Sequence, residues 1–557
     1  MEISSAVSPY FPPVGVKKRK SKTLHSITTH DAVSQRALGA YYTPSSAADF
    51  VAEWAVRNDG EHIIEPSFGD GSFLRAIAKV AECKKLLGLH LTGIEINSGA
   101  LAEAPQLDVL QDVKLCHDDF LAFSPVATQA IIANPPYVRL RKLPEDQRLR
   151  GMAATRAVGH EMDPAGSVWM PFVIHAARFL TPGGRMAFVL PYDFTYVRYA
   201  RPLWAYLGRN FGSLRIIRTH ERLFADIYQE VVLLLADDFG GSCTTVNFEA
   251  YEKVSDLLAL RPSIEEALNL DDIVRGKRVF LEALLTPALR HLLADRLTEQ
   301  LAPAREQLTF NIGYVTGDKD FFHPKPHEIE AYTIPATSLR PAIITARMLK
   351  GVGLNTSGLA NSGATALFLP PADALTSGEQ EYVLHGEKQG VSKRYKCQIR
   401  QPWYVVPGVK VPDLILSVFS ERPLLLRNDA EYVASNSLLC GYCAPGTRDA
   451  LITAWYTSLT LLQIELEVHA LGGGVMVMVP GEAGNIRLPR PVQASSKHLK
   501  ALDKHLLEGQ SEAAYSLGDV AVLKAQLNLT DDEVNLVREG VRTLAHWRTS
   551  SRATSTD

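Results

Sequence analysis

The segment Ile131–Tyr137, with the sequence Ile-Ile-Ala-Asn-Pro-Pro-Tyr, places an amide, two prolines and an aromatic ring at the end of an apolar run. The prolines have no N–H to donate and a fixed φ, so they form a stiff turn with free carbonyl oxygens. An exocyclic aryl amine is a poor nucleophile because its lone pair is spread into the ring. Two acceptors aimed at its hydrogens, the side-chain oxygen of Asn134 and the carbonyl of Pro135, would draw the nitrogen towards tetrahedral geometry. The segment therefore indicates chemistry on an amine.

The last two residues of this segment, Pro136 and Tyr137, complete the candidate site. Proline fixes the turn, and the tyrosine ring can stack on a planar substrate, which is worth about 1–3 kcal/mol. An alternative for the same residues is an Asn-Pro turn followed by a core tyrosine. The chemical interpretation is favoured because a glycine turn and two acids precede the segment, each where a strand is expected to end.

The glycine turn lies in Ile63–Leu74, which predicts a strand, a tight turn and the start of a helix. Gly69 and Gly71 let the backbone approach a ligand, and the helix N-terminus supplies free N–H groups. Many α/β folds make such a turn without binding a cofactor. Glu95 ends the next apolar run, where a carboxylate can accept the two hydroxyl hydrogens of a ribose. A solvated acid at a strand end is the alternative.

A further acid, Asp119, follows in His117–Phe120. The Asp119 carboxylate can accept a hydrogen from the adenine amine of a nucleoside cofactor, and the Phe120 ring can cover the adenine. These residues and the glycine turn together predict a nucleoside-binding site.

A βαβ order of elements positions these residues. Apolar, β-branched runs predict strands, and 3.6-residue periodicity predicts helices between them. The strands are expected at 62–65, 91–96, 130–133, 185–190, 213–219 and 231–236, and the helices at 46–57, 72–85 and 169–180. This order predicts a largely parallel sheet whose carboxyl edge carries the site.

With 557 residues the chain is too long for one hydrophobic core. Short strands broken by Gly and Pro, with several aromatics, predict a β-rich module after the first domain. The boundaries expected from the sequence are a disordered tail at 1–30, a catalytic domain at 31–245, a helical connector at 246–305, the β-rich module at 306–494 and a helical segment at 495–557.

Composition excludes several classes of protein. The chain is 46% hydrophobic and 21% charged, as in globular proteins. The first residues do not have the pattern of a signal peptide, and no apolar run reaches membrane-spanning length, so we expect a cytoplasmic protein without a membrane partner. Cys440 and Cys443 have the spacing of a metal or redox pair, but no second pair lies nearby, so we expect no metal.

The net charge of −3 does not indicate a nucleic-acid binder by itself, but local clusters of basic residues do occur. A cluster of this kind is also compatible with an ordinary solvated face. We expect phosphate contacts from Arg139, Arg141, Lys142, Lys393 and Arg394.

Taken in this order, the motifs resemble those of the gamma class of N6-adenine DNA methyltransferases, in particular the type II restriction-modification methylases. The likeness extends over 39–492, and Gly39–Pro44 is similar to the N-terminal cofactor segment of that family. The later module resembles its target-recognition domain at Ile312–Phe321, Leu471–Val475 and Asn485–Pro489, although these glycines can also be simple turn formers. The resemblance implies a Rossmann-like, S-adenosylmethionine-dependent α/β domain followed by a β-rich target-recognition domain and C-terminal helices.

The resemblance also implies roles for individual residues. The cofactor would be held by Thr43, Pro44, Glu65, Ser67, Gly69, Gly71, Glu95, Asp119 and Phe120, and the flipped adenine by Asn134, Pro135, Pro136 and Tyr137. Phe224 matches the place of a further aromatic against that base, with a plug of the sheet edge as its alternative. One departure is Ser67-Phe68, where relatives often carry a small residue and cysteine.

The implied function is methyl transfer from S-adenosylmethionine to the N6 amine of a flipped-out adenine in double-stranded DNA, as the modification part of a restriction-modification system. A separately encoded cognate restriction endonuclease is a candidate partner. One alternative is an RNA or protein-glutamine methyltransferase, although those enzymes lack the β-rich module. Another is an inactive DNA-binding defence component, against which Glu95 and the intact Asn134–Tyr137 segment argue.

Overall fold

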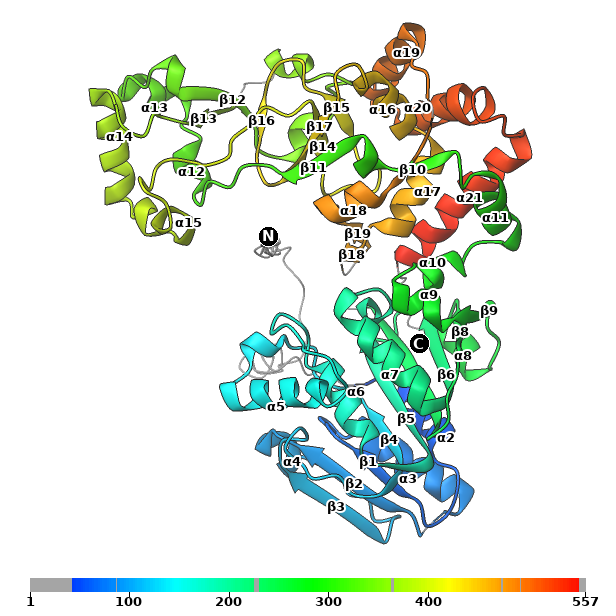
Figure 1. Cartoon of the computed structure of the whole chain (residues 1–557). Helices are drawn as coiled ribbons and strands as arrows, with labels where there is room; N and C mark the ends of the chain where they lie inside the picture. Colours follow the sequence, from blue (N-terminus) through cyan, green and yellow to red (C-terminus); the bar gives the residue numbers. More distant parts are fainter. Residues whose placement is uncertain are drawn as a thin grey trace, which may run out of the picture.

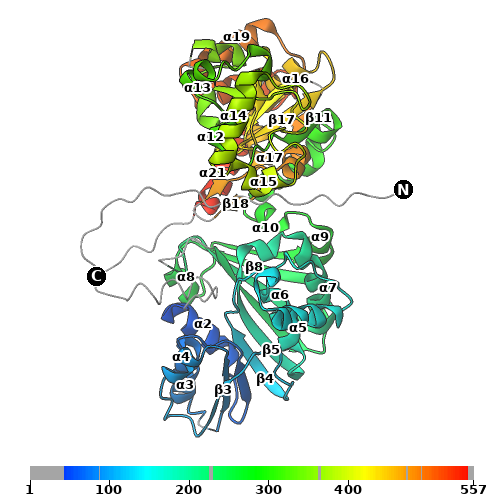
Figure 2. The same cartoon turned by 90° about the vertical axis from the view of Figure 1, so that its left-hand side faces the viewer.

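The computed structural model describes residues 43–549 apart from 87, 225–229, 362–364, 472–473 and 491, so the predicted tail at 1–30 lies outside the described residues. Figure 1 shows two parts, a domain built on a large sheet and a module of shorter strands and helices. Figure 2, turned by 90°, shows the module stacked on the domain, with α10 (Val279–Glu282) between them.

Within the described residues, nine strands of the catalytic domain form one sheet in the order β3-β2-β1-β4-β5-β7-β6-β8-β9. Neighbours from β3 to β5 are parallel, and β7 is antiparallel to both of its neighbours. The strands are β1 (His62–Glu65), β2 (His90–Glu95), β3 (Asp112–His117), β4 (Thr128–Ala133), β5 (Leu180–Pro191), β6 (Phe211–Thr219), β7 (Val231–Phe239), β8 (Thr245–Tyr251) and β9 (Ile264–Asn269). The predicted Rossmann-like α/β fold is confirmed.

The central strands are apolar along their whole length because both faces of the sheet are covered. Ile63 and Ile64 are both fully buried, yet they belong to different hydrophobic clusters, one on each face. Helices α2 (Ser45–Ala55) and α3 (Ser72–Lys84) cover one face, and α6 (Trp169–Ala177) and α7 (Arg201–Asn210) cover the other. The small helices α4 (Ser98–Ala102) and α8 (Val254–Leu258) and the longer α5 (Glu145–Arg156) complete the domain.

The predicted helical connector at 246–305 is wrong in its first part. β8 pairs with β6 and β9 pairs with β8, so both strands extend the catalytic sheet. β9 was missed because it is an edge strand whose solvent-facing positions carry Glu265 and other polar residues, which leaves few apolar positions. Helices do follow, namely α9 (Leu270–Arg275), α10, α11 (Pro287–His291) and a π-helix at Leu292–Arg296.

The module contains short strands in four separate sheets, in the part of the chain that the structure describes. The first and last strands of the module, β10 (Leu301–Pro303) and β20 (Arg487–Pro489), pair with each other. The module therefore begins slightly before the predicted residue 306. The remaining strands are β11 (Leu308–Ile312), β12 (Leu339–Ile343), β13 (Thr365–Phe368), β14 (Leu414–Ser417), β15 (Leu425–Arg427), β16 (Val433–Ala434), β17 (Leu438–Cys443), β18 (Ala470–Leu471) and β19 (Val475–Met476).

Helices pack around these strands. They are α12 (Lys319–Phe322), α13 (Pro326–Ala331), α14 (Ser377–Lys388), α15 (Tyr395–Gln398), α16 (Arg448–Trp455), α17 (Ser458–Glu467) and α18 (Pro480–Asn485). The β-rich module predicted from the sequence is therefore confirmed, with helices α16 and α17 contributing to its main core.

The predicted helical segment at the end of the chain is present as α19 (Ser496–Leu507), α20 (Ser511–Gly518), a π-helix at Asp519–Lys524 and α21 (Asp531–Arg548). Helix α21 packs on α17 of the module and on α11. Its last turn reaches the catalytic domain, where Arg218 donates to the Trp547 carbonyl over 2.6 Å. None of the described helices has the length and apolarity needed to cross a membrane.

At the same contact the rings of His220 and His546 stack, with centroids 3.8 Å apart and planes inclined by 16°. His546 lies 3.0 Å from the Glu252 carboxylate. A metal ion lies in the plane of each imidazole that binds it, and two rings stacked face to face have no such position in common. The three side chains therefore form a stacked pair with an acid and not a preformed metal centre.

Candidate active site

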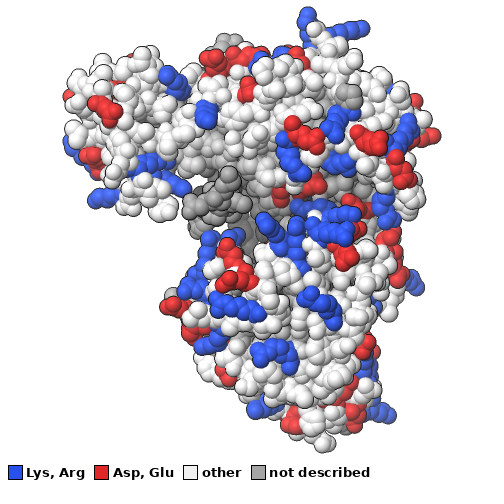
Figure 3. All heavy atoms as spheres, viewed as in Figure 1, with Lys and Arg blue, Asp and Glu red and all other residues white. Residues whose placement is uncertain are grey.

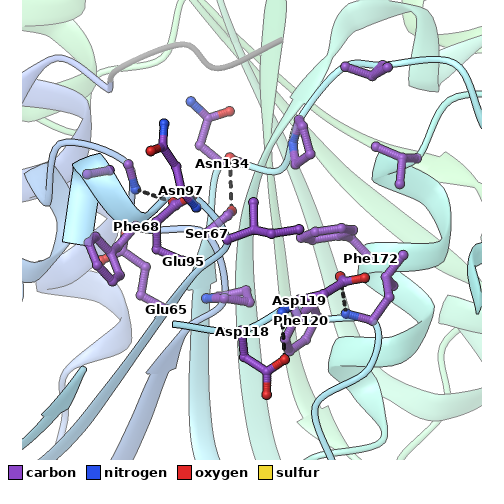
Figure 4. Close-up of a pocket in the computed structure, with 18 of the residues that line it drawn as sticks. Glu65, Ser67, Phe68, Glu95, Asn97, Asp118, Asp119, Phe120, Asn134 and Phe172 are labelled. Atoms are coloured by element: carbon purple, nitrogen blue, oxygen red, sulfur yellow. Dashed lines mark hydrogen bonds between the residues drawn. The ribbon is translucent and has the colours of Figure 1, made fainter. Parts of the chain in front are cut away.

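A cavity of about 510 Å³ opens at the carboxyl edge of the sheet. Figure 4 shows side chains from the β1–α3 turn and from the ends of β2, β3 and β4 converging on it, with Phe172 of α6 on one side. It brings together nine of the residues predicted to hold the cofactor or the target base: Thr43, Glu65, Ser67, Gly69, Glu95, Asp119, Phe120, Asn134 and Pro136.

The glycine turn has the conformation that its residues require. Gly69 and Gly71 have φ values of 53° and 74°, a region that other residues rarely adopt. A Cβ on Gly71 would lie 2.5 Å from Pro105 Cδ. Gly71 is the N-cap of α3, so the first N–H groups of that helix begin directly after the turn.

Glu95 is held in place by the backbone of two segments. The Gly69 N–H donates to one carboxylate oxygen and the Asn97 N–H donates to the other, each over 2.9 Å. The side chain is largely buried, with 9% exposure for the residue. Since each oxygen keeps a further lone pair, the carboxylate is oriented to accept two more hydrogens, as a ribose diol would supply.

Glu65 lies at the floor of the cavity and is 1% exposed. Its Oε2 atom has no hydrogen-bond partner among the described residues. Burial, followed by the charges of Asp70 and Glu95, holds the pKa of the Glu65 carboxyl well above its usual range. Burial therefore disfavours the charged form of this carboxyl.

Asp119 and Phe120 form another wall. Arg150 on α5 contacts one oxygen of Asp119 over 2.5 Å, and the Leu121 N–H donates to the other over 3.0 Å. The carboxylate is thus fixed while each oxygen keeps one lone pair. Phe120 is buried against Phe172, with ring centroids 5.3 Å apart, and these rings give the cavity an apolar side.

Asn134 stands at the opening of the cavity, directly after β4. Its Nδ2 donates to Thr43 Oγ1 over 3.2 Å, and its Oδ1 accepts from the Tyr137 hydroxyl over 3.1 Å. The same tyrosine hydroxyl lies 3.0 Å from the Val189 carbonyl on β5. Ser67 donates to the backbone carbonyl of Asn134 over 3.3 Å, which ties the glycine turn to the Asn-Pro-Pro-Tyr segment.

Several predicted residues lie around the cavity without lining it. Pro44 caps α2 next to Thr43, and Pro135 is buried beneath the opening. The Tyr137 ring packs against the hydrophobic clusters of both sheet faces. Phe224 is 5% exposed, belongs to the hydrophobic core and does not line the cavity. This is the location expected of a side chain that fills the edge of the sheet. Stacking of Phe224 or Tyr137 on a base stays a prediction.

The predicted phosphate contacts are exposed in both parts. Arg139, Arg141 and Lys142 lie between β4 and α5, and Lys142 also lines the cavity. Lys393 and Arg394 lie just before α15, where Arg394 is 3.5 Å from Asp318. Figure 3 shows Lys and Arg side chains over α5 in the domain and over α15 in the module.

The structure adds cavity residues that the sequence did not single out. Asn97 caps α4 by accepting from the Gly99 N–H, an arrangement that its position before a short helix could have indicated. Val168 and Phe172 read as core residues in an apolar helix, and Gln147 lies on the polar helix α5. No pattern in the sequence marks these three as cavity residues, because only the chain's return over the sheet edge brings them there.

Two family models match the chain. Residues 26–198 match N-6 DNA Methylase, and residues 277–523 match the C-terminal domain of Type II methyltransferase M.Eco57I. The first match contains the whole cavity, and the second contains the module with most of the C-terminal helices.

Relatives match both parts at once. Type II methyltransferase M.AccI of Acinetobacter calcoaceticus is 21% identical over 422 residues, which cover 73% of this chain and 76% of that protein. Type II methyltransferase M.XamI of Xanthomonas campestris pv. amaranthicola is 22% identical, with the same coverage of both chains. The solved structure of the Type IIL restriction-modification enzyme MmeI in complex with DNA is similar in fold over 87% of this chain and 70% of that chain, at 13% identity and a TM-score of 0.50. Together, the two family models and these relatives identify the chain as a DNA adenine methyltransferase of the type II restriction-modification kind.

Proposed function

We propose that this enzyme transfers the methyl group of S-adenosylmethionine to the N6 amine of an adenine that has been swung out of double-stranded DNA. The observation that carries the proposal is the convergence of Glu95 and Asn134 on one cavity. The first presents two oriented acceptors suited to a ribose, and the second presents an amide at the opening where a base would enter.

The cavity residues fit a nucleoside cofactor. A volume of about 510 Å³ is in the range of small-molecule sites. A Cβ on Gly71 would collide with Pro105, so the close approach of the backbone at this turn depends on glycine. The buried Glu65 Oε2 atom has no hydrogen-bond partner among the described residues and is therefore available to bind a ligand. These features are those of a site built for a polar, ring-containing molecule.

We assign the cofactor contacts as follows. Glu95 would accept the ribose hydroxyl hydrogens, Asp119 would accept from the adenine amine, and Phe120 would contact the adenine ring. The methionine part would be held by Thr43, Pro44, Glu65, Ser67 and the turn at Gly69 and Gly71, as in the family that the sequence resembles. The bound cofactor supplies a methyl group on a sulfonium, which is already activated for displacement.

The protein's own contribution is to prepare and align the amine. Asn134 Oδ1 and the Pro135 carbonyl accept the two hydrogens of the target N6, which makes its lone pair available. This hydrogen bonding strengthens as the nitrogen becomes tetrahedral, so it stabilises the transition state more than the ground state. The buried turn fixes both acceptors and thereby the line of attack.

The DNA contacts are part of the same proposal. The basic residues near α5 and near α15 lie on different parts of the molecule and would neutralise phosphates on both sides of the target base. Residues 306–494 would read the sequence, and a separately encoded restriction endonuclease would cut the same site when it is unmethylated. The MmeI complex with DNA, a protein of similar fold, supports this placement.

Methyl transfer to defined substrates tests the proposal. Purified protein is incubated with labelled S-adenosylmethionine and mixed-sequence duplex DNA, total RNA or a glutamine-containing peptide, and the modified nucleosides are separated by mass spectrometry. We expect N6-methyladenine in duplex DNA, at one sequence context in methylation-sensitive sequencing. Label in RNA or in the peptide alone would contradict the proposal, and so would N4-methylcytosine as the DNA product.

A further inference from the structure

The short helix α15 presents two apolar side chains to the solvent. Tyr395 is 71% exposed, more than any other large hydrophobic residue that the structure describes, and Ile399 is 62% exposed. They are four positions apart, so they lie on the same side of the helix. Cys397, two positions from each, is fully buried on the opposite side. Single exposed hydrophobic residues are normal on a protein surface, but two that adjoin indicate a contact with another molecule.

The residues around Tyr395 are strongly basic. Lys393, Arg394 and Lys396 are exposed, and the Lys396 Nζ atom lies 5.7 Å from the centroid of the Tyr395 ring. The sequence from 388 to 412 contains six lysines and arginines and no acidic residue. Cations around an exposed aromatic ring are suited to a polyanion that also carries planar groups. Duplex DNA is such a molecule, whereas an acidic or apolar protein surface would match only half of this arrangement.

The buried side of α15 is held in place by the turn that follows β11. The Arg400 guanidinium donates to the Thr316 carbonyl over 2.7 Å, and the Cys397 thiol lies 3.7 Å from the same oxygen. Gly317 has a φ of 95°, and a Cβ on it would lie 2.9 Å from the Cβ of Lys396. The turn therefore requires glycine both for its conformation and because α15 packs directly on it.

These contacts give a physical reason for the Thr-Gly-Asp turn within Ile312–Phe321, a segment that the sequence analysis singled out. The turn fixes the buried side of α15 and leaves the side with Tyr395 exposed. Asp318, the last residue of the turn, adds an ion pair with Arg394 over 3.5 Å. The Arg394 side chain is still 64% exposed, so this pair leaves it accessible to a phosphate.

The position of α15 relative to the catalytic domain agrees with a contact to DNA. Figures 1 and 2 both show α15 on the side of the module that faces α5. Lys142, just before α5, lines the cavity that is to receive the target base. A duplex with its adenine in that cavity would therefore lie between α5 and α15, and its neighbouring bases would come towards Tyr395.

We propose that residues 393–399 read the duplex, with Tyr395 and Ile399 on base edges and the lysines and arginine beside them on phosphates. This inference rests on the proposed function, because it concerns the DNA that the enzyme methylates, and it names residues of the module that distinguish one sequence from another. An apolar contact with a base edge, such as the methyl group of thymine, carries sequence information, whereas a phosphate contact does not. The two kinds of residue should therefore respond differently to substitution.

The base contact is tested by fluorescence anisotropy with the full-length protein and two duplexes. One duplex carries the sequence found by methylation-sensitive sequencing, and the other has that sequence scrambled. Tyr395→Ala should weaken binding to the first duplex roughly 10-fold and to the second much less, because the base contact forms only on the matching sequence. Tyr395→Phe keeps the ring and should bind both duplexes with near-native affinity.

The phosphate contacts are tested by combining Lys393→Ala with Lys396→Ala. This double variant should weaken binding to both duplexes by the same factor. It should also reduce the slope of log affinity against log salt concentration by about 2, since each lost phosphate contact changes the slope by about 1. Lys500→Ala, which removes an exposed lysine of α19 outside the segment, is the control and should change neither quantity.

Three results would overturn the proposal. Equal losses for Tyr395→Ala on the two duplexes, or no loss on either, would exclude the base contact, and a native salt slope in the lysine variant would exclude the phosphate contacts. A Tyr395→Ala protein that binds both duplexes normally but sediments as a smaller species would make this surface a contact between copies of the chain. Each variant should keep the native melting temperature and S-adenosylmethionine affinity, since the substituted side chains are exposed. A native protein that binds mixed-sequence duplex without methylating adenine would reject the proposed function alone, and the salt slope of the lysine variant on that duplex would still decide this inference.

Discussion

The catalytic domain and the β-rich module, which extends from β10 to β20, are stabilised in different ways. In the described residues the domain has one continuous sheet with strands of up to 12 residues, such as Leu180–Pro191, whereas the module divides strands of two to six residues among four sheets. The domain is stabilised mainly by backbone hydrogen bonds between paired strands. The module depends more on single side chains that tie loops together.

Asn428 is an example of a single side chain that ties loops together in the module. It is 4% exposed, its Nδ2 donates to the carbonyls of Pro412 and Tyr432 over 2.8 Å each, and its Oδ1 accepts from the Tyr432 N–H and from Thr356. A buried amide with all of these groups satisfied fixes a loop without a ladder. The difference between the two parts suggests that single substitutions destabilise the module and its helices more than the sheet. The first of the four predictions below tests this difference in stability, and the others, in order of decreasing effect, concern the catalytic domain and its contact with α21.

The largest effect is expected from Arg548→Ala. Arg548 holds the end of α21 by a two-pronged contact with Glu465, with distances of 2.9 and 3.1 Å, and both side chains are less than 10% exposed. Removing the arginine leaves a buried acid without its cation, which costs about 3–5 kcal/mol. Denaturant unfolding should show this loss. Burial already raises the pKa of Glu465, so part of the loss should be recovered at low pH.

A matched control is Arg490→Ala, whose ion pair with Glu306 is more than 40% exposed on both sides. Its loss should cost about 1 kcal/mol or less. If the two substitutions lowered the free energy of unfolding equally, the buried ion pair would stabilise the protein no more than the exposed one, and this prediction would be wrong.

Asn134→Ala should lower the single-turnover rate of methyl transfer by at least ~100-fold, or about 2.7 kcal/mol, because it removes an acceptor that acts mainly in the transition state. The free energy of unfolding, S-adenosylmethionine affinity and DNA affinity should stay near native values, since the side chain lies at the opening of the cavity and not in the core. Asn134→Asp keeps an acceptor and should retain more activity than the alanine variant. A folded Asn134→Ala enzyme with a near-native rate would reject the mechanism.

Glu95→Ala should weaken S-adenosylmethionine binding by at least ~10-fold, since hydrogen bonds to a charged group are each worth about 1.5–3 kcal/mol. The same carboxylate accepts from Gly69 and Asn97, so the variant also frees the glycine turn. Glu95→Gln keeps one acceptor oxygen and should bind with intermediate affinity in calorimetry. Unchanged affinity in the alanine variant would exclude the ribose role.

The smallest effect concerns pH at the contact between α21 and the catalytic domain. Burial, followed by the neighbouring His546, lowers the pKa of His220, although Glu252 acts in the opposite direction. The unfolded chain therefore binds a proton at His220 near pH 6.5, where the folded protein binds less. Stability from this residue should be present above about pH 6.5 and should fall as the pH is lowered through that value. Melting temperatures between pH 8 and 5.5 should show a flatter profile for His220→Gln, and identical profiles would contradict this assignment.

Much of the catalytic domain could be predicted from the sequence because its central strands are long, apolar and regularly spaced. The chemistry of the site could be predicted as well, since the glycine turn, Glu95 and the Asn-Pro-Pro-Tyr segment all end strands of a parallel sheet. Such strand ends meet at one edge whatever the details of packing. Eight of the predicted residues line the same cavity for this reason, and Thr43 is the exception.

Other features had no local signal. β3 has half-exposed residues along most of its length, so it shows no apolar run. The contact between Thr43 and Asn134 depends on how the segment before α2 crosses the sheet edge, which periodicity does not report. The same holds for the contact of Arg218 with Trp547, where residues 329 positions apart are brought together by the path of the whole chain.

The return of α21 to the catalytic domain has a practical consequence for exchanging the β-rich module between relatives. The β-rich module is joined to the domain covalently through α9–α11, and the helices that follow it are joined to the domain a second time through Arg218 and His220 at the end of α21. A chimaera that exchanges only the module would leave the native α21 packed against a foreign α17. Exchanged units should therefore extend from the strand β10 to the last turn of α21, or else keep the native helix and redesign the face it presents to α17.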